Sequence, residues 1–285
     1  MKLYRYLDFS GGLRTLKDSV LKVTRPINFN DPFEYLIRMR VNRNTFRKCC
    51  LDKIPKKEMD SLVRTKLKEK GIIKPTKRQK QVEYNNIKDD FRKKFENGFN
   101  RSSAERAVKR LDLLSPVMGV TCFTENDNNS LMWSHYSDGH KGMVIEFETN
   151  IAFKVKPQII KIKYVEEPPS IIVPYWALKD SNSSTSSVHQ KKILGYKHII
   201  WKYEKEYRIQ FDVNILRKEK SADGEELLLF DIPKESIRRV VMGCRMSPKC
   251  FEELKAILNQ SNYRHLKIQR SVAPVSSYKL DYQDL

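Results

Sequence analysis

A chain of 285 residues is long enough to bury one large hydrophobic core, or two smaller ones, without help from disulfides or metals. Hydrophobic residues make up 40% of the chain and charged residues 32%, which excludes a disordered or membrane-spanning protein. No apolar run approaches the roughly 20 residues of a spanning helix, and the first residues lack the apolar stretch of a signal peptide. We therefore expect a soluble, cytosolic protein.

The five cysteines have no CxxC spacing, which argues against a disulfide framework or a zinc site. His135 and His140 are five residues apart, whereas two ligands on one helix face are four apart. The residue pattern therefore predicts reduced thiols and no metal.

The charge is strongly positive, with 55 Lys and Arg against 35 Asp and Glu, a net charge of +20. Residues 38–112 hold 24 of the basic and 10 of the acidic residues, so this segment alone carries +14 and the rest of the chain +6. Such an excess implies an acidic partner, and nucleic acid is the commonest one. A partner protein remains an alternative, and the sequence does not indicate an oligomeric state.

The predicted elements begin with a short strand at residues 3–7, followed by Gly11 and Gly12 and an amphipathic helix at 13–21. Residues 23–34, VTRPINFNDPFE, contain two prolines and an Asn-Asp pair. Proline excludes a regular helix and Asn-Asp favours a turn, so this segment is predicted to be an ordered loop.

From residue 45 to residue 114 the apolar spacing is helical, with breaks at Pro55 and at 71–75. This stretch contains most of the excess positive charge. The pattern therefore predicts a basic helical insertion at residues 40–115 within a single domain that spans residues 1–285.

After Pro116 the pattern changes to short apolar, β-branched runs that are typical of strands. Together with the helices they predict a mixed α+β fold. The polar stretch KDSNSSTSS is typical of a surface loop. Strands are predicted at 117–123, 142–148, 159–165, 206–213, 226–232, 238–243 and 265–271, and helices at 187–201 and 248–259.

Four short blocks combine polar residues with aromatic ones, and each falls at the beginning or end of a predicted strand. In α+β proteins such positions form binding sites, so the four blocks are predicted to share a cleft. Met132 and Trp133 are the exceptions, because large apolar residues of this kind usually belong to the core. The blocks are residues 4–6, 30–34, 132–142 and 201–208.

Arg5 and the segments NDPFE, CFTEN, MWSHYSDGHKG and YEKEYR, in that order, resemble a bacterial family known only as a domain of unknown function. The order of elements is also similar to that of ADP-ribosyltransferases, including those that target DNA. Those enzymes place an Arg or His on the opening strand, a Ser or Tyr in the middle, and a catalytic Glu, often within Glu-x-Glu, on a late strand. The resemblance implies a mostly antiparallel, ADP-ribosyltransferase-like sheet, NAD as substrate, and a toxin or phage-defence effector.

On this resemblance Glu206 is the catalytic candidate, because a carboxylate can stabilise the positive charge that develops on ribose when the bond to nicotinamide breaks. Glu204, two residues away on a strand, would face the same side and orient or deprotonate the acceptor. The acceptor stays open between DNA, RNA, protein and water. A guanidinium can bind pyrophosphate and aromatic faces can stack on nicotinamide, so the expected nucleotide-binding residues are Tyr4, Arg5, Asn30, Asp31, Ser134, His135 and Tyr136.

Several of these residues also have a structural interpretation. Glu204 and Glu206, beside Lys205 and Arg208, are equally consistent with an exposed ion-pair face at the start of a strand. Turn chemistry alone would explain the Asn-Asp-Pro sequence at 30–32.

Two other functions are compatible with the sequence. The first is a non-enzymatic nucleic-acid-binding or regulatory module in which Arg92, Lys93 and Lys94 contact phosphates. Aromatic residues near them could stack on bases but also fit a helix core; these are Tyr84, Phe91, Phe95 and Phe99. The second is a metal-dependent nuclease that would cluster Asp31, Glu34, Glu146 and Glu206 around Mg²⁺.

Overall fold

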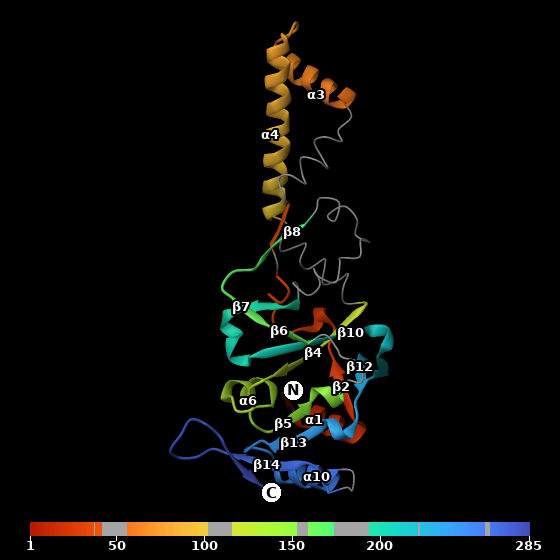
Figure 1. The fold of residues 1–285 in the computed structure, drawn as a ribbon, viewed down its shortest axis with the longest axis vertical. Coiled ribbons are helices and arrows are strands. Elements are labelled where there is room, and N and C mark those ends of the chain that lie inside the picture. Colours follow the sequence, from red (N-terminus) through yellow and green to blue (C-terminus); the bar gives the residue numbers. More distant parts are fainter. Residues whose placement is uncertain are drawn as a thin grey trace. The chain divides into compact units, whose positions relative to one another are not determined.

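The computed structural model describes residues 1–36, 38–41, 56–101, 116–152, 159–173, 194–221, 223–259 and 263–285. The chain divides into two compact units, whose elements are labelled in Figure 1. Unit 1 consists of residues 1–34, 111–166 and 194–285, and unit 2 of residues 35–110 and 167–193.

Unit 1 is built on an eight-stranded sheet with the strand order β15-β14-β13-β5-β1-β4-β10-β6. Its neighbouring strands are antiparallel, except for the parallel pair β13 and β14. The predicted α+β class with a mixed, mostly antiparallel sheet is therefore confirmed. The strands are β1 (Lys2–Leu7), β4 (Met118–Thr124), β5 (Met143–Glu148), β6 (Ile159–Lys161), β10 (Glu206–Asp212), β13 (Ile237–Met242), β14 (Lys267–Val272) and β15 (Asp281–Asp284).

The main hydrophobic core lies on one face of this sheet. Alternation along β10 places Ile209 and Phe211 in that core and the preceding Arg208 on the other face. Leu residues from two helices and from a second, three-stranded sheet pack against the same core. These covering elements are α1 (Phe9–Asp18), α10 (Pro248–Leu258), β2 (Val20–Val23), β11 (Arg217–Lys220) and β12 (Glu226–Asp231).

The first helix begins earlier and ends earlier than the sequence predicts. Asp8 caps α1 by accepting a hydrogen bond from the backbone N–H of Gly11 at 2.6 Å, and the left-handed Ser19 (φ 55°) ends the helix. The two glycines therefore lie inside α1 rather than before it. Gly12 is required there, because a Cβ at this position would collide with the side chain of Met143.

The predicted helix at 187–201 is wrong where the structure describes it. Residues Tyr196–His198 form β9, which pairs in parallel with β7 (Lys163–Val165), and a 3₁₀ helix, η3 (Ile199–Glu204), follows. Pairing with β7 and the burial of Lys197 among carboxylates override the local helical pattern. Residues 187–193 and the KDSNSSTSS stretch lie outside the described residues.

The remaining predicted strands of unit 1 agree with the structure to within two residues, as does the helix α10. The strand predicted at 159–165 is divided at Ile162, whose N–H bonds to the carbonyl of Glu206 at 3.0 Å. The loop predicted at 23–34 is ordered and contains a short 3₁₀ helix, η1 (Pro26–Asn28).

Unit 2 contains two helices, α3 (Lys56–Glu69) and α4 (Lys77–Arg101), and a parallel strand pair, β3 (Arg38–Val41) with β8 (Ser170–Val173). The helices confirm the helical pattern where it is described, and the turn between them covers the break predicted at 71–75. Residues 42–55 and 102–115 of the predicted insertion lie outside the described residues. The small core between the helices consists of Met59, Val63, Leu67 and Ile87.

Among the described helices, none combines the length and the apolar character that crossing a membrane would require.

Candidate functional site

A cavity of about 170 Å³ opens in unit 1 where β1 meets β4. The strands β1 and β4 pair at a single position, Tyr4 with Thr124, whereas β4 and β10 pair at seven positions. Pockets for drug-sized ligands have volumes of about 300–1,000 Å³, so this one can enclose a single ring or sugar. It is lined by Tyr4, Arg5, Tyr6, Phe29, Asn30, Glu34, Cys122, Phe123, Thr124, Met132, Tyr136, Lys197, Glu204 and Glu206.

Three carboxylates and two cations form a buried ion-pair cluster, comprising Glu34, Lys197, Glu204, Glu206 and Arg208, on one side of this cavity. Arg208, which is 0% exposed, donates from Nε to Glu206 Oε1 at 2.6 Å and from Nη2 to both oxygens of Glu34 at 2.9 Å. The Nζ of Lys197 lies 2.7 Å from Glu204 Oε2 and 3.2 Å from Glu206 Oε2. Buried charges are stable in a protein only with such pairing, and the sum of these five charges is −1.

The strand β10 positions two members of the cluster by simple alternation. Glu206 lies opposite Thr124 and Arg208 opposite Cys122 in the neighbouring strand, so all four residues share the face that borders the cavity. The backbone N–H of Glu206 donates to the hydroxyl of Tyr164 at 2.7 Å, which fixes the first residue of the strand.

Glu204 reaches the cavity by a different route from the one predicted. It is the last residue of η3 rather than part of a strand, and Lys205 after it adopts a left-handed conformation (φ 46°). Strand alternation therefore does not explain why Glu204 and Glu206 converge. The turn at Lys205 and the shared partner Lys197 bring the two carboxylates together, and Thr124 Oγ1 anchors the carbonyl of Glu204 at 2.6 Å.

The NDPFE segment supplies Glu34 through a tight turn. Asp31 Oδ1 accepts from the N–H of Phe33 at 2.9 Å, and the Asp31 carbonyl accepts from the N–H of Glu34 at 3.1 Å. Asp31 thus holds the turn and does not line the cavity, whereas Asn30 does line it. The sequence placed Glu34 in the NDPFE block and in the nuclease interpretation but did not predict its pairing with Arg208.

Tyr136 is the residue of helix α6 (Ser130–Tyr136) that reaches the ion-pair cluster. Its hydroxyl donates to Glu204 Oε1 at 2.5 Å and also bonds to the side chain of Asn30. Met132 and Trp133 are buried, as predicted for core residues, although Met132 also borders the cavity.

Ser134 and His135 do not line the cavity. Both side chains are exposed, with Ser134 Oγ 3.4 Å from His140 Nε2 and His135 Nδ1 3.0 Å from the Tyr203 hydroxyl. On the short helix α6 they lie away from Trp133 and Tyr136 because only residues three or four apart share a helix face.

Arg5 contributes a cation that has no carboxylate partner among the residues described by the structure. Its Nη1 donates to the carbonyl of Lys22 at 3.4 Å, and its guanidinium lies 5.7 Å from the centroid of the Phe123 ring. Burial lowers the pKa of Arg5 to about 10, so the side chain stays charged at neutral pH. Arg5 is among the residues that line the cavity, and its charged guanidinium lies on the Phe123 side of it.

The two cavity carboxylates of the Glu-x-Glu segment have opposite pKa shifts. Burial raises the pKa of Glu206, but Arg208 and Lys197 lower it more, to about 2. For Glu204, burial outweighs the opposing effect of Lys197 and its pKa rises above the usual 4.5. Glu206 is therefore a permanent anion, while Glu204 can take up a proton more readily.

The exposed ion-pair face considered for Glu204 and Glu206 is wrong, because their side chains are only 4% and 5% exposed. The four carboxylates of the nuclease interpretation do not lie together either. Glu146 lies on β5, three strand positions or about 14 Å from β10, and pairs with Arg239 at 2.9 Å. Across the described parts of the chain, no three His, Cys, Asp or Glu residues are grouped to hold a metal ion.

Arg92, Lys93 and Lys94 lie in α4 of unit 2 and not in the unit that contains the cavity. Lys93 is exposed, and the side chains of the other two lie outside the described residues. Their contact with nucleic acid stays a prediction.

The aromatic residues of the same helix differ from one another. Tyr84 packs against the small core of unit 2, which confirms the helix-core interpretation, with Lys88 4.5 Å above its ring. Phe91 is 47% exposed, so that interpretation is wrong there. The side chains of Phe95 and Phe99 lie outside the described residues.

Residues 132–209 match a family described as Protein of unknown function (DUF2971). Neither a curated protein nor a solved structure matches the chain. The matched segment includes Tyr136, Lys197, Glu204, Glu206 and Arg208 and therefore much of the cavity. The expected similarity to a domain of unknown function is thus confirmed for this segment of the chain.

Proposed function

We propose that unit 1 is an ADP-ribosyltransferase-like enzyme whose cavity binds the nicotinamide ribose of NAD and breaks the bond to nicotinamide. The observation that carries this proposal is that one cavity combines a permanently ionised, buried Glu206 with the charged Arg5, for which the described residues provide no carboxylate. A carboxylate suits a sugar that becomes cationic, and a guanidinium suits the pyrophosphate attached to it.

In the reaction, the bond between ribose C1′ and the nicotinamide nitrogen breaks, and its electron pair leaves with nicotinamide. Positive charge then develops on the ribose ring, and Glu206 stabilises it electrostatically. Arg208 and Lys197 weaken the field of Glu206, but Glu34 and Glu204 offset them, so the cluster keeps its net negative charge. Because these ion pairs are already formed, Glu206 does not have to reorient during the reaction.

Glu204 serves as the base in this proposal. As the oxygen of water or of an acceptor bonds to C1′, its proton passes to Glu204, whose raised pKa suits a proton acceptor. Lys197 and Tyr136 each hold one oxygen of the Glu204 carboxylate and so fix its position. A cavity of about 170 Å³ holds the ring or the ribose, and in this proposal Arg5 binds the pyrophosphate attached to that ribose.

We further propose nucleic acid as the acceptor, because residues 38–112 carry a charge of +14. An enzyme of this kind would suit a toxin or a phage-defence effector, a role that the resemblance to DNA-targeting ADP-ribosyltransferases implies. The second candidate function, a non-enzymatic nucleic-acid-binding module, is supported by the same charge and requires no contribution from the cavity.

Release of nicotinamide from NAD by the purified full-length chain tests the enzymatic proposal, with and without nucleic acid present. Replacing Glu206 with Gln keeps the side-chain volume but removes the anion, so the rate should fall by about 10²-fold or more. The control is Glu219→Gln, which removes the same charge from a partly exposed pair on β11 and should leave the rate unchanged.

Thermal unfolding of both variants shows whether Glu206→Gln remains folded at the assay temperature. A folded Glu206→Gln protein with the wild-type rate would contradict the assignment of Glu206. Failure of the wild-type protein to release nicotinamide under any condition would favour the binding module.

A further inference from the structure

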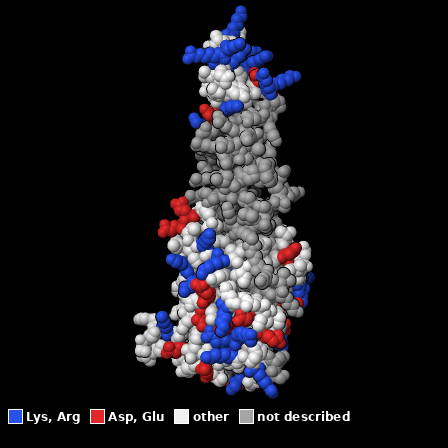
Figure 2. Space-filling view, in the orientation of Figure 1, with Lys and Arg blue, Asp and Glu red and all other residues white. Residues whose placement is uncertain are grey.

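The positive charge of unit 2 is concentrated at the turn that joins its two helices. Residues 66–80, here called the hairpin tip, contain seven Lys and Arg and one Glu. The preceding residues 56–65 contain three basic and two acidic residues, and the following residues 81–91 contain one basic and three acidic ones. The net charge is therefore +6 at the tip, +1 before it and −2 after it, and Figure 2 shows Lys and Arg side chains gathered over this hairpin.

Most cations of the hairpin tip have no ion-pair partner among the described residues. Lys66 pairs with Glu69 at 3.4 Å and Lys70 with Glu83 at 2.5 Å. These pairs leave five exposed cations, which repel one another and contribute nothing favourable to folding through ion pairs. They are Lys68, Lys74, Lys77, Arg78 and Lys80.

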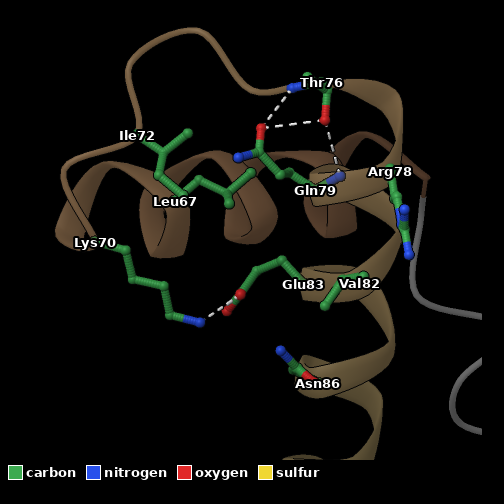
Figure 3. Close-up of a pocket in the computed structure, with 9 residues that line it drawn as sticks. All are labelled: Leu67, Lys70, Ile72, Thr76, Arg78, Gln79, Val82, Glu83 and Asn86. Atoms are coloured by element: carbon green, nitrogen blue, oxygen red, sulfur yellow. Dashed lines mark hydrogen bonds and ion pairs between the residues drawn. The ribbon is translucent and has the colours of Figure 1, made fainter.

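The turn that carries these cations has a well-defined conformation (Figure 3). Gly71 adopts a left-handed conformation (φ 76°) at the end of α3, and the N–H of Ile72 bonds to the carbonyl of Leu67 at 2.9 Å. At the start of α4, Thr76 and Gln79 cap each other with bonds of 2.8 Å and 3.2 Å. The cations are thus fixed at their backbone positions, so binding an anionic partner costs little ordering of the chain.

A groove of about 390 Å³ lies beside these cations, between the end of α3 and the start of α4 (Figure 3). Its apolar lining comes from Leu67, Ile72 and Val82. Its polar lining comes from the paired Lys70 and Glu83 and from Thr76, Arg78, Gln79 and Asn86. Ile73, at the apex of the turn, is 83% exposed. A groove that combines apolar side chains with hydrogen-bonding groups, next to unpaired cations, fits a planar base attached to a phosphate.

We propose that the hairpin tip binds single-stranded nucleic acid, with phosphates on its unpaired cations and an unstacked base in the groove. An anionic membrane is a poorer partner, because the apolar residues Met59 and Val63 of α3 are buried against α4 and leave no continuous apolar face to insert. This binding surface is independent of the proposed NAD chemistry and differs from the Arg92–Lys94 contact predicted from the sequence.

Fluorescence anisotropy of a labelled single-stranded oligonucleotide, titrated with the full-length protein in the absence of NAD, tests the proposal. The tip variant replaces Lys74, Lys77 and Lys80 with Ala. Its affinity should fall by about tenfold or more, and the slope of log affinity against log salt should decrease by about 2, at about 0.7 per lost phosphate contact. The matched control replaces three exposed lysines of unit 1, Lys218, Lys220 and Lys249, with Ala and should retain the wild-type slope.

If the tip variant and its control lose the same amount of oligonucleotide affinity, the proposal is overturned. It is also overturned if affinity falls only in a variant with Arg92, Lys93 and Lys94 replaced by Ala. Duplex DNA that binds as tightly as the single strand would overturn the assignment of the groove. A further outcome is that the tip variant loses binding to phosphatidylcholine–phosphatidylserine vesicles but binds the oligonucleotide as the wild type does. That outcome would show that the partner of the tip is a membrane surface and not nucleic acid. Measurement without NAD keeps each of these outcomes separate from the proposed enzymatic activity.

Discussion

Glu204 and Glu206 are two residues apart and share Lys197, yet their environments shift their pKa values in opposite directions. The difference arises from Arg208, which bonds to both oxygens of Glu206 but to neither oxygen of Glu204. Two carboxylates with separated pKa values are suited to separate tasks, one as a fixed anion and one as a proton acceptor.

The acid side of the pH–rate profile should report Glu204. Glu206 stays ionised down to about pH 2, whereas the pKa of Glu204 lies above 4.5. Nicotinamide release should therefore be lost as the pH falls through a value above 4.5, where Glu204 becomes protonated. In Glu204→Gln the residual rate should not change over that range, as measured by kcat/KM against pH. An identical acid limb in wild type and variant would exclude Glu204 as the base.

The stability of unit 1 should depend on Arg208. Replacing it with Met leaves Glu34 and Glu206 buried without their principal cation, which costs about 3–5 kcal/mol. The partly exposed Arg217, which pairs with Glu219 and Asp231, is a suitable comparison, and Arg217→Met should cost about 1 kcal/mol or less. Urea denaturation of both variants measures the difference. Similar losses for the two would show that the buried cluster adds no special stability.

At the residue scale, the sequence predicted the part of the site that depends on local pattern. Tyr4, Arg5, Asn30, Tyr136 and both glutamates of the Glu-x-Glu segment line the cavity. What the sequence did not predict is Lys197, because its contacts depend on long-range pairing that local pattern does not contain. Ser134 and His135 belong to the same MWSHYSDGHKG block as Tyr136 but do not line the cavity, because consecutive residues of a helix lie on different faces.

At the scale of elements, close packing between backbones explains part of the MWSHYSDGHKG block. A Cβ on Gly142 would collide with the backbone carbonyl of Leu7 at the end of β1. The block thus has a structural function in addition to any chemical one, because it lets the turn after α6 pass directly over the strand that carries Arg5.

Gly142→Ala should therefore destabilise the protein by about 2 kcal/mol or more, since backbone on both sides has to move. Gly11→Ala in α1 is the control, because the nearest atoms to its Cβ belong to the side chains of Asp8 and Leu7 and not to backbone, and alanine favours the helix. Thermal denaturation of the two variants compares them. A stable Gly142→Ala protein would show that β1 and the turn separate easily, in which case the cavity would not be rigid.

The elements most accurately predicted are the strands of the main sheet, where short apolar, β-branched runs mark strands that are largely buried. The short strands β2, β11 and β15 were not predicted. The strands β11 and β15 pair with neighbouring strands, but their sequences, RKEK and DYQD, carry no apolar run. The strand β2 pairs with β12, which is distant in sequence, so local pattern does not reveal it. The helix predicted at 187–201 fails for the same reason, as β9 exists only by pairing with β7.

At the scale of the whole molecule, the cavity and the hairpin tip belong to different compact units. The charge and the helical pattern predicted an insertion at residues 40–115. In the structure β8 pairs with β3, and unit 2 therefore also includes residues 167–193. A pairing between such distant segments leaves no local signal in the sequence. NAD chemistry is thus proposed for unit 1 and an anionic partner for unit 2.

The most direct test of the central claim is nicotinamide released per molecule of full-length protein over time, compared among wild type, Glu206→Gln and Glu219→Gln. The account predicts many turnovers by wild type and Glu219→Gln, and a rate lower by about 10²-fold or more for folded Glu206→Gln. Equal rates for wild type and folded Glu206→Gln, or no release by wild type with nucleic acid present, would contradict it.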